Sequence, residues 1–209
     1  MSDPKDVNKE LIEACKTGRL DEVGNLINEG ADPNFVGEHN LTPLLWICSN
    51  RERESVVRYL LQKGANVNYD GFGEGTALML AAYAGEINLL TLYLEFGARV
   101  DCALPRGGET ALHMAAVKGK TDAMKLLVQA KANTNQRANT NAHTEMFSGG
   151  AQLWGETPLH FAAAYGDVLM IQTLFDGGAD KTVENAHGEW PLAYAGRHKR
   201  PREILKLLA

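Results

Sequence analysis

One short pattern recurs along the chain at a nearly constant interval. Four segments begin with threonine and run into an apolar stretch: TPLLWICSNR from Thr42, TALMLAAYAG from Thr76, TALHMAAVKG from Thr110 and TPLHFAAAYG from Thr157. The successive threonines are 34, 34 and 47 residues apart. Self-similarity at such a period is typical of stacked repeats, in which each unit buries its apolar face only against its neighbours. The chain is therefore predicted to form one array of stacked units.

Two weaker copies complete the array. LIEACKTG follows Lys9, which stands 33 residues before Thr42, and WPLAYAGRHK begins at Trp190, which stands 33 residues after Thr157. Six units of about 33 residues account for almost all of the 209 residues, so we expect a single domain, 1–209. The expected units are 6–38, 39–72, 73–106, 107–153 with an insertion at 136–155, 154–186 and 187–209.

The recurring residues suit a helix, a turn and a second helix in each unit. Thr157 is a good helix N-cap, and Pro158 falls at the first helical position, where a missing N–H has little cost. The pair Ala162–Ala163 is small enough for neighbouring helices to approach closely. A second apolar stripe follows at helical spacing, and Gly178 ends it.

The pattern T-P-L-H-x-A, with a closing Gly-Ala-Asx, resembles the ankyrin-repeat family over essentially the whole chain. The resemblance implies an all-α fold, a solenoid of stacked helix-turn-helix units with projecting β-hairpin loops. It also implies that His113 and His160 are structural, because in this family that ring bonds the backbone of adjoining turns. The expected function is binding of a protein partner on the concave face formed by inner helices and hairpin loops.

Composition narrows the class of protein further. The net charge of -5 argues against a dedicated nucleic-acid binder, and no apolar run is long enough to span a bilayer. The polar start, MSDPKDVNKE, lacks the apolar core of a signal peptide, and three cysteines do not suggest a disulfide framework. We expect a cytoplasmic monomer that binds protein, without nucleic-acid or membrane partners.

The apparent catalytic and cofactor-binding motifs are incomplete. KGKT, at 118–121, lacks the glycine that a phosphate-binding loop needs five residues before Gly119, where Met114 stands. The histidines show no metal-ligand spacing, and no nucleophile elbow is present. We therefore expect no enzyme, cofactor or metal. The alternative left open is a small-ligand-binding or catalytic protein that uses an aromatic concave cleft.

Departures from the repeat indicate where function lies. The insertion at 136–155 carries Phe147 and Trp154, and insertions in repeat proteins often reach the binding face. Lys131 replaces the glycine that closes other units, so that helix is expected to end less cleanly. A basic cluster at 197–202 is read as a solvated cap, with a localisation signal or an acidic-partner contact as alternatives.

Accessible positions of the inner helices and hairpins are rich in aromatic residues. The predicted protein-binding residues are Trp46, Tyr69, Phe72, Tyr83, Lys118, Phe147, Trp154, Phe161 and Tyr165. For Trp46 and Phe161, packing between helices is an equal alternative. We expect a partner along units two to five, anchored by Tyr83, Tyr165 and Trp154, because exposed aromatics are frequent interface anchors.

Overall fold

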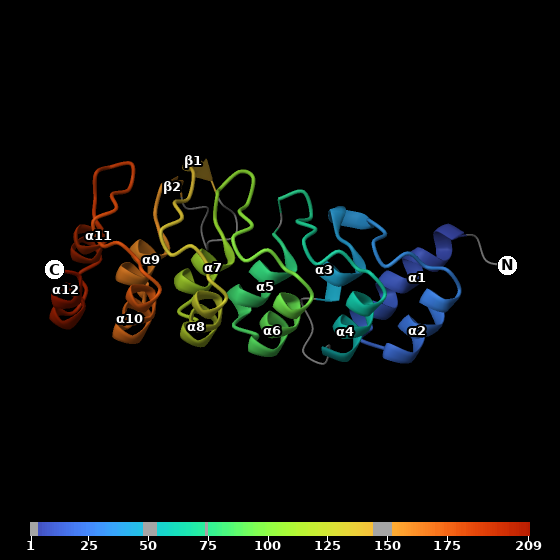
Figure 1. The fold of residues 1–209 in the computed structure, drawn as a ribbon. Coiled ribbons are helices and arrows are strands. Elements are labelled where there is room, and N and C mark those ends of the chain that lie inside the picture. The colour runs from blue at the N-terminus through green and yellow to red at the C-terminus, as the bar shows by residue number, and fades with distance from the viewer. Residues whose placement is uncertain (1–3, 48–53, 74, 144–151) are drawn as a thin grey trace. The chain divides into compact units, whose positions relative to one another are not determined.

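A computed structural model describes residues 4–47, 54–73, 75–143 and 152–209 (Figure 1). The chain divides into two compact units by its contacts. Unit 1 comprises residues 1–77 and 92–98, and unit 2 comprises residues 78–91 and 99–209.

Unit 1 contains two helical hairpins of the expected kind. Its elements are α1 (Pro4–Thr17), α2 (Leu20–Asn28), the short 3-10 helix η1 (Glu38–Asn40), α3 (Pro43–Ile47) and α4 (Glu54–Gln62). α1 packs on α2 and α3, and α4 packs on α2 and α3. The apolar stripe of α4, with Val56, Val57 and Leu60, is completely buried, as its helical spacing predicts.

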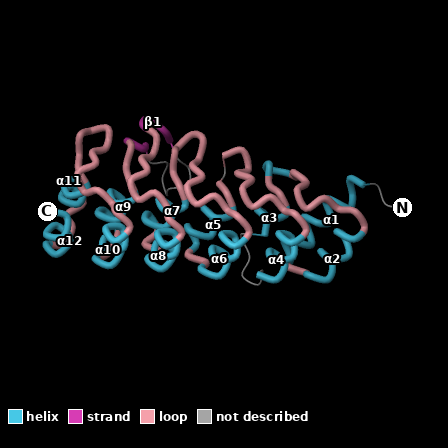
Figure 2. The backbone as a smooth tube through the Cα atoms, in the orientation of Figure 1, coloured by secondary structure: helices cyan, strands magenta, loops and turns pink. Residues whose placement is uncertain are grey.

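Unit 2 repeats the same two-layer plan. Its helices are α7 (Ala111–Val117), α8 (Thr121–Gln129), α9 (Pro158–Tyr165), α10 (Val168–Asp176), α11 (Pro191–Arg197) and α12 (Arg202–Leu208), together with most of α5 (Ala77–Ala84) and the start of α6 (Ile87–Glu95). α9 packs between α7 and α11 in an inner row, whereas α10 contacts α8 and α12 in an outer row. The all-α fold class is confirmed, and the loops between repeats project beside the inner row (Figure 2).

The insertion adds a small two-stranded ribbon to unit 2. β1 (Thr140–His143) and β2 (Gln152–Trp154) pair antiparallel, with an irregularity between Thr140 and Ala142. The segment before β1 is tied to the preceding hairpin, because the backbone N–H of Asn139 donates to the carbonyl of Gly107 at 2.7 Å. The amide of Ala186 donates to the carbonyl of Trp154, which ties β2 to the next hairpin. The ends of the inserted loop are therefore part of the row of hairpins.

The two histidines of the repeat lock neighbouring units together. The backbone N–H of Thr157 donates to Nδ1 of His160 at 3.1 Å, so Nε2 carries the proton and donates to the carbonyl of Glu189 at 3.0 Å. His113 makes the same bonds, accepting from Thr110 at 3.1 Å and donating to the Glu156 carbonyl at 3.3 Å. Both rings are buried, which confirms their structural role.

An asparagine in several hairpins bridges to the following repeat. In unit 2, Nδ2 of Asn135 donates to the carbonyl of Gly178 at 2.9 Å, and its Oδ1 accepts from the amide of Asp180 at 2.7 Å. In unit 1, Asn34 bonds Gly64 and Asn66 in the same way. The amide side chain is suited to this position because it both donates and accepts.

Lys131 does not end its helix less cleanly, contrary to the prediction. Its φ of 68° lies in the left-handed region that Gly97 and Gly178 occupy at the equivalent positions. The amides of Lys131 and Ala132 donate to the carbonyls of Val128 and Leu127 at 2.9 and 3.0 Å, which closes the helix. The hydrogen bonds of the helix end therefore impose the glycine conformation on a lysine.

Candidate binding surfaces

The most accessible predicted anchor is Tyr165, the last residue of α9. Half of its surface is exposed, and its ring meets that of His198 edge-on at 5.2 Å. His198 in turn lies 5.0 Å from the ring of Tyr194. The guanidinium of Arg200 donates to the carbonyl of Gly166, directly after Tyr165. An aromatic side chain thus stands beside basic residues at one end of the inner helices of unit 2.

Tyr83, in α5, and Lys118, directly after α7, form a pair between two successive inner helices. The Nζ atom of Lys118 lies 4.4 Å from the centre of the Tyr83 ring, and both side chains are partly exposed. A cation over an aromatic face at this distance is favourable, and it holds the long lysine side chain in place. The sequence predicts both residues as part of the binding surface. Their contact is visible only in the structure, because it depends on how the two helices stack.

Trp154 lies at the other end of α9, among the hairpins. Its ring packs on that of His187 with 4.3 Å between centres, and its amide donates to the Glu156 carboxylate at 2.7 Å. Trp154, in β2, precedes the first residue of α9 by four positions, and Tyr165 is the last residue of this helix, which spans about 12 Å at 1.5 Å per residue. A partner that contacts both must run along the whole helix.

Phe161 occupies a core position in this structure. Only 5% of its surface is exposed, and its ring meets His113 edge-on at 6.0 Å. Phe161 therefore packs between helices, which is one of the two alternatives that the sequence allows, because α7 and α11 cover the apolar face of α9. We leave Phe161 out of the proposed interface. Phe147 lies outside the described residues.

Tyr69 and Phe72 lie together in a hairpin of unit 1. Their rings meet edge-on at 6.2 Å, and the Tyr69 hydroxyl donates to the carbonyl of Asn40 at 3.0 Å. Phe72 is 74% exposed and has a φ of 58°, held by a turn in which its amide donates to Asp70. Tyr69 thus supports the hairpin, while Phe72 projects from it.

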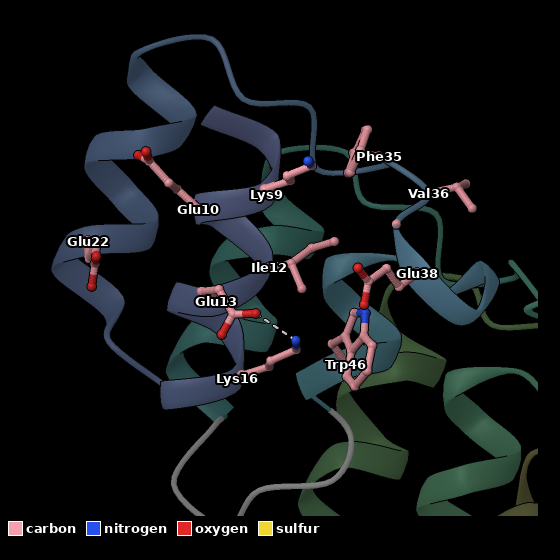
Figure 3. Close-up of a pocket in the computed structure, with 11 residues that line it drawn as sticks. Lys9, Glu10, Ile12, Glu13, Lys16, Glu22, Phe35, Val36, Glu38 and Trp46 are labelled. Carbon is pink, nitrogen blue, oxygen red and sulfur yellow. Dashed lines mark hydrogen bonds and ion pairs between the residues drawn. The ribbon is translucent and has the colours of Figure 1, made fainter. Parts of the chain in front are cut away.

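Trp46 lines a pocket of unit 1 that the sequence did not reveal. The cavity measures about 650 Å³ and has an apolar wall made by Ile12, Phe35, Val36 and Trp46 (Figure 3). The chain passes close to α1 at Gly37, where a Cβ atom would lie 2.4 Å from Ile12 Cδ1. The sequence predicts Trp46 as a binding residue, but nothing in the repeat pattern places it beside the apolar pair at 35–36.

Charged residues surround the apolar wall of this pocket. Lys16 lies with its Nζ 4.3 Å from the Trp46 ring centre and 2.6 Å from the Glu13 carboxylate. Lys9, Glu10 and Glu38 also line the pocket (Figure 3). The pocket can therefore hold an apolar group while its rim contacts charge of either sign.

The sequence identifies the basic cluster at 197–202 but does not place it beside Tyr165. His198 stands 33 residues after Tyr165, so the repeat period places it at the equivalent position of the last unit. Burial, followed by the nearby positive charges of Arg197 and Arg200, lowers the pKa of His198. The same period identifies this pair, whereas the sequence favours a solvated cap for the basic cluster, with a localisation signal or an acidic-partner contact as alternatives.

Neither a metal site nor a membrane span is found in the part of the chain that the structure describes. There, no group of three or more histidine, cysteine, aspartate or glutamate side chains has the geometry to hold a metal ion. No helix among these residues is long and apolar enough to cross a bilayer.

Comparison with known proteins identifies the family. A model for three copies of the ankyrin repeat matches residues 11–102 and 69–138, and a model for many copies matches residues 112–175. The B-cell lymphoma 3 protein homolog of Mus musculus is 29% identical over 193 residues, covering 89% of this chain and 39% of that protein. The mitochondrial disaggregase of Homo sapiens is 30% identical over 219 residues, covering 98% of this chain and 26% of that protein.

A solved structure matches over nearly its full length. It is a chain from the complex of a predatory endopeptidase from Bdellovibrio bacteriovorus with an immunity protein. The TM-score is 0.75 at 28% identity, and 96% of each chain is covered. The curated relatives are longer, since this chain spans between 15% and 39% of the first three of them. The chain belongs to the ankyrin-repeat family, whose repeats generally serve as protein–protein interaction modules.

Proposed function

We propose that this protein binds a protein partner along the inner helices of unit 2, with Tyr165 as the central anchor. The observation that carries the proposal is the half-exposed Tyr165 ring beside His198, at the end of a helix whose other apolar residues are buried. Tyrosine is enriched among the residues that dominate binding energy, because its ring buries a large area and its hydroxyl can still hydrogen-bond.

Two further residues extend the proposed interface. Tyr83, with Lys118 over its ring, adds a preordered contact, and Trp154 adds a second aromatic surface near the hairpins. Contacts that hold side chains in place before binding reduce the conformational entropy lost on association. The neighbouring solved structure comes from a complex of two proteins, which supports a binding role for this fold.

The test compares anchors with a matched exposed residue. A partner is captured from the source cell with the full chain and purified, and its Kd is measured by calorimetry. Tyr165→Ala is expected to weaken binding by about 2 kcal/mol, roughly thirtyfold. Leu169→Ala, at an equally exposed residue of α10, is the control and is expected to bind like the parent. Equal affinity for both variants would overturn the proposed site.

The pocket beside Trp46 favours a second candidate function, binding of a small apolar ligand. Its volume and apolar wall are within the range of ligand pockets. The probe is 8-anilinonaphthalene-1-sulfonate, whose fused rings suit the apolar wall and whose sulfonate suits Lys16. Its fluorescence is expected to rise with the parent chain and with Trp190→Ala, but not with Trp46→Ala. Equal fluorescence with all three chains would dispose of this candidate.

A further inference from the structure

Basic residues surround Tyr165 on the turns that join the two helices of each repeat in unit 2. We call this the turn surface and define it by six residues: Lys118, Lys120, Tyr165, His198, Lys199 and Arg200. Lys118, Tyr165 and His198 end the inner helices, or directly follow them, in three consecutive repeats. The packing of α9 against α7 and α11 makes them neighbours in a row.

The positive charge of the turn surface is held in place by contacts with the fold. Lys118 lies over the Tyr83 ring, and the stem of Lys120 lies over Gly85, where a Cβ atom would meet Lys120 Cδ at 2.8 Å. Arg200 donates to the carbonyl of Gly166. The side chains of Lys118, Lys120 and Arg200 are therefore held in place before a partner arrives, whereas Lys199 is exposed.

Three carboxylates of these turns bear on these charges. Glu86 is exposed and directly follows Gly85, so it opposes one of the two lysines, Lys118 and Lys120. Asp167 lies in the middle turn, but its carboxylate accepts from the amide of Met170 at 2.8 Å and caps α10. Asp122 pairs with Lys125 at 3.4 Å. Arg197, beside the turn surface, pairs with Glu189 at 2.9 Å, and is therefore not counted in it.

The acidity of the chain is concentrated elsewhere. Unit 1 contains fourteen acidic and eight basic residues, whereas unit 2 contains twelve acidic and thirteen basic residues. Subtracting acidic from basic residues gives unit 1 a net charge of -6 and unit 2 a net charge of +1, so the total of -5 conceals the basic surface of unit 2. The overall charge does not describe the potential that a partner meets at Tyr165.

We propose that the turn surface of unit 2 binds an acidic, extended segment of a protein partner, with an apolar side chain of that segment over Tyr165. The inference rests on the proposed function and specifies the chemistry of the partner. Packed helices lie about 8–10 Å apart, and an extended chain advances about 3.3 Å per residue. Carboxylates about three residues before and after the apolar residue therefore reach the lysine side and the His198 side of Tyr165.

The first test uses synthetic peptides and the full chain. The probe peptide has a central leucine with glutamates three residues to each side, and in its control peptide lysines replace the glutamates. The acidic peptide is expected to bind at least about tenfold more tightly, and its affinity is expected to fall as salt is added. In NMR spectra the ring signals of His198, and not those of exposed His39, are expected to shift. Equal binding of the two peptides would overturn the proposal.

The second test locates the charge. Lys118→Glu with Lys120→Glu changes the net charge by the same amount as Lys125→Glu with Lys181→Glu, which lie outside the turn surface. The first pair is expected to weaken binding of the acidic peptide about tenfold, and the second pair less than about twofold. Equal losses would show a general charge effect and overturn the proposed surface.

The captured partner separates this inference from the proposed function. Suppose that Tyr165→Ala weakens binding of the captured partner but that Lys118→Glu with Lys120→Glu does not. The proposal of an acidic partner segment is then wrong, and the proposed protein-binding function stands. If neither change matters, both proposals fail. A single-stranded oligonucleotide that binds the turn surface more tightly than the acidic peptide would contradict the assignment to a protein partner.

Discussion

At the scale of single residues, backbone hydrogen bonds can hold a residue in a backbone conformation that its side chain disfavours. Lys131 adopts a φ of 68° because the amides of Lys131 and Ala132 complete the end of α8. Residues other than glycine pay about 1–2 kcal/mol for this conformation, since Cβ approaches the carbonyl oxygen. The sequence showed the substitution but could not show that the local hydrogen bonds outweigh this strain.

Replacing Lys131 with glycine should therefore stabilise the protein. We expect Lys131→Gly to raise the free energy of unfolding by about 1 kcal/mol, despite the greater freedom of glycine in the unfolded chain. Lys125→Gly, within α8, should instead lower it by about 1 kcal/mol. Urea unfolding followed by circular dichroism measures both. A less stable Lys131→Gly variant would contradict the strain assigned to this residue.

The buried histidines make stability depend on pH. Burial lowers the pKa of His113 from 6.5 to about 4. Its contribution is complete above the unfolded pKa and is lost as pH falls through 6.5 toward 4, because the unfolded chain binds the proton first. Each tenfold difference in proton affinity corresponds to about 1.4 kcal/mol, so the loss by pH 4.5 is about 2–3 kcal/mol.

The measurement compares the parent chain with His113→Gln at pH 7 and pH 4.5. The variant should be less stable at pH 7, but its free energy of unfolding should fall less on acidification, by about 2–3 kcal/mol. Carboxylates titrate in both chains, so the difference between them reports His113. His39→Asn, at an exposed ring, should retain the parent's pH dependence. If His113→Gln retains it as well, the burial of a neutral ring is not its cause.

At the scale of elements, the repeat pattern predicted the helices well because one periodicity fixes capping, packing and termination together. The reciprocal bonds of Thr157 with His160 follow from the T-P-L-H order alone. The ribbon of β1 and β2 was not predicted, since no alternation of apolar residues marks it. Its strands depend on hydrogen bonds to neighbouring hairpins rather than on their own sequence.

The hairpin asparagines should contribute to cohesion between repeats. Asn135→Ala removes two hydrogen bonds to the next repeat, those with Gly178 and Asp180. At about 1 kcal/mol for each bond, we expect a loss of about 2 kcal/mol in the free energy of unfolding. Gln129→Ala, at an exposed residue of α8, should change it by less than about 0.5 kcal/mol. Equal stability of both variants would show that the bridge contributes nothing.

At the scale of the whole molecule, the candidate site divides into a part the sequence could give and a part it could not. The repeat positions predict Tyr83, Tyr165 and Lys118 as site residues, because the period shows which residues end each inner helix. The contact of Tyr165 with His198 and the pocket beside Trp46 join residues from different repeats. The period relates Tyr165 to His198, but the pocket depends on packing between Trp46 and residues of a different repeat position, Ile12, Phe35 and Val36, which no periodicity encodes.

The last repeat should act as a cap on unit 2. In a repeat array each unit contacts only its neighbours, so a terminal unit covers an apolar face that would otherwise meet water. α11 packs on α9, and α12 packs on α10, burying Tyr194, Ile204 and Leu208. His160 also contacts the last repeat. It donates to the Glu189 carbonyl, and its ring meets that of Tyr194 edge-on with 5.6 Å between the ring centres.

A chain shortened to residues 1–180 is therefore expected to melt at a lower temperature and to aggregate, as measured by calorimetry and size-exclusion chromatography. Ile204→Ala in the full chain separates loss of packing from loss of the cap. It should cost about 2–5 kcal/mol of stability through the cavity it leaves, yet stay monomeric because the polar outer face of α12 remains. A shortened chain that stays monomeric and melts like the parent would show that α9 and α10 need no cover, and that the last repeat is kept for the contacts of His198 and its basic neighbours.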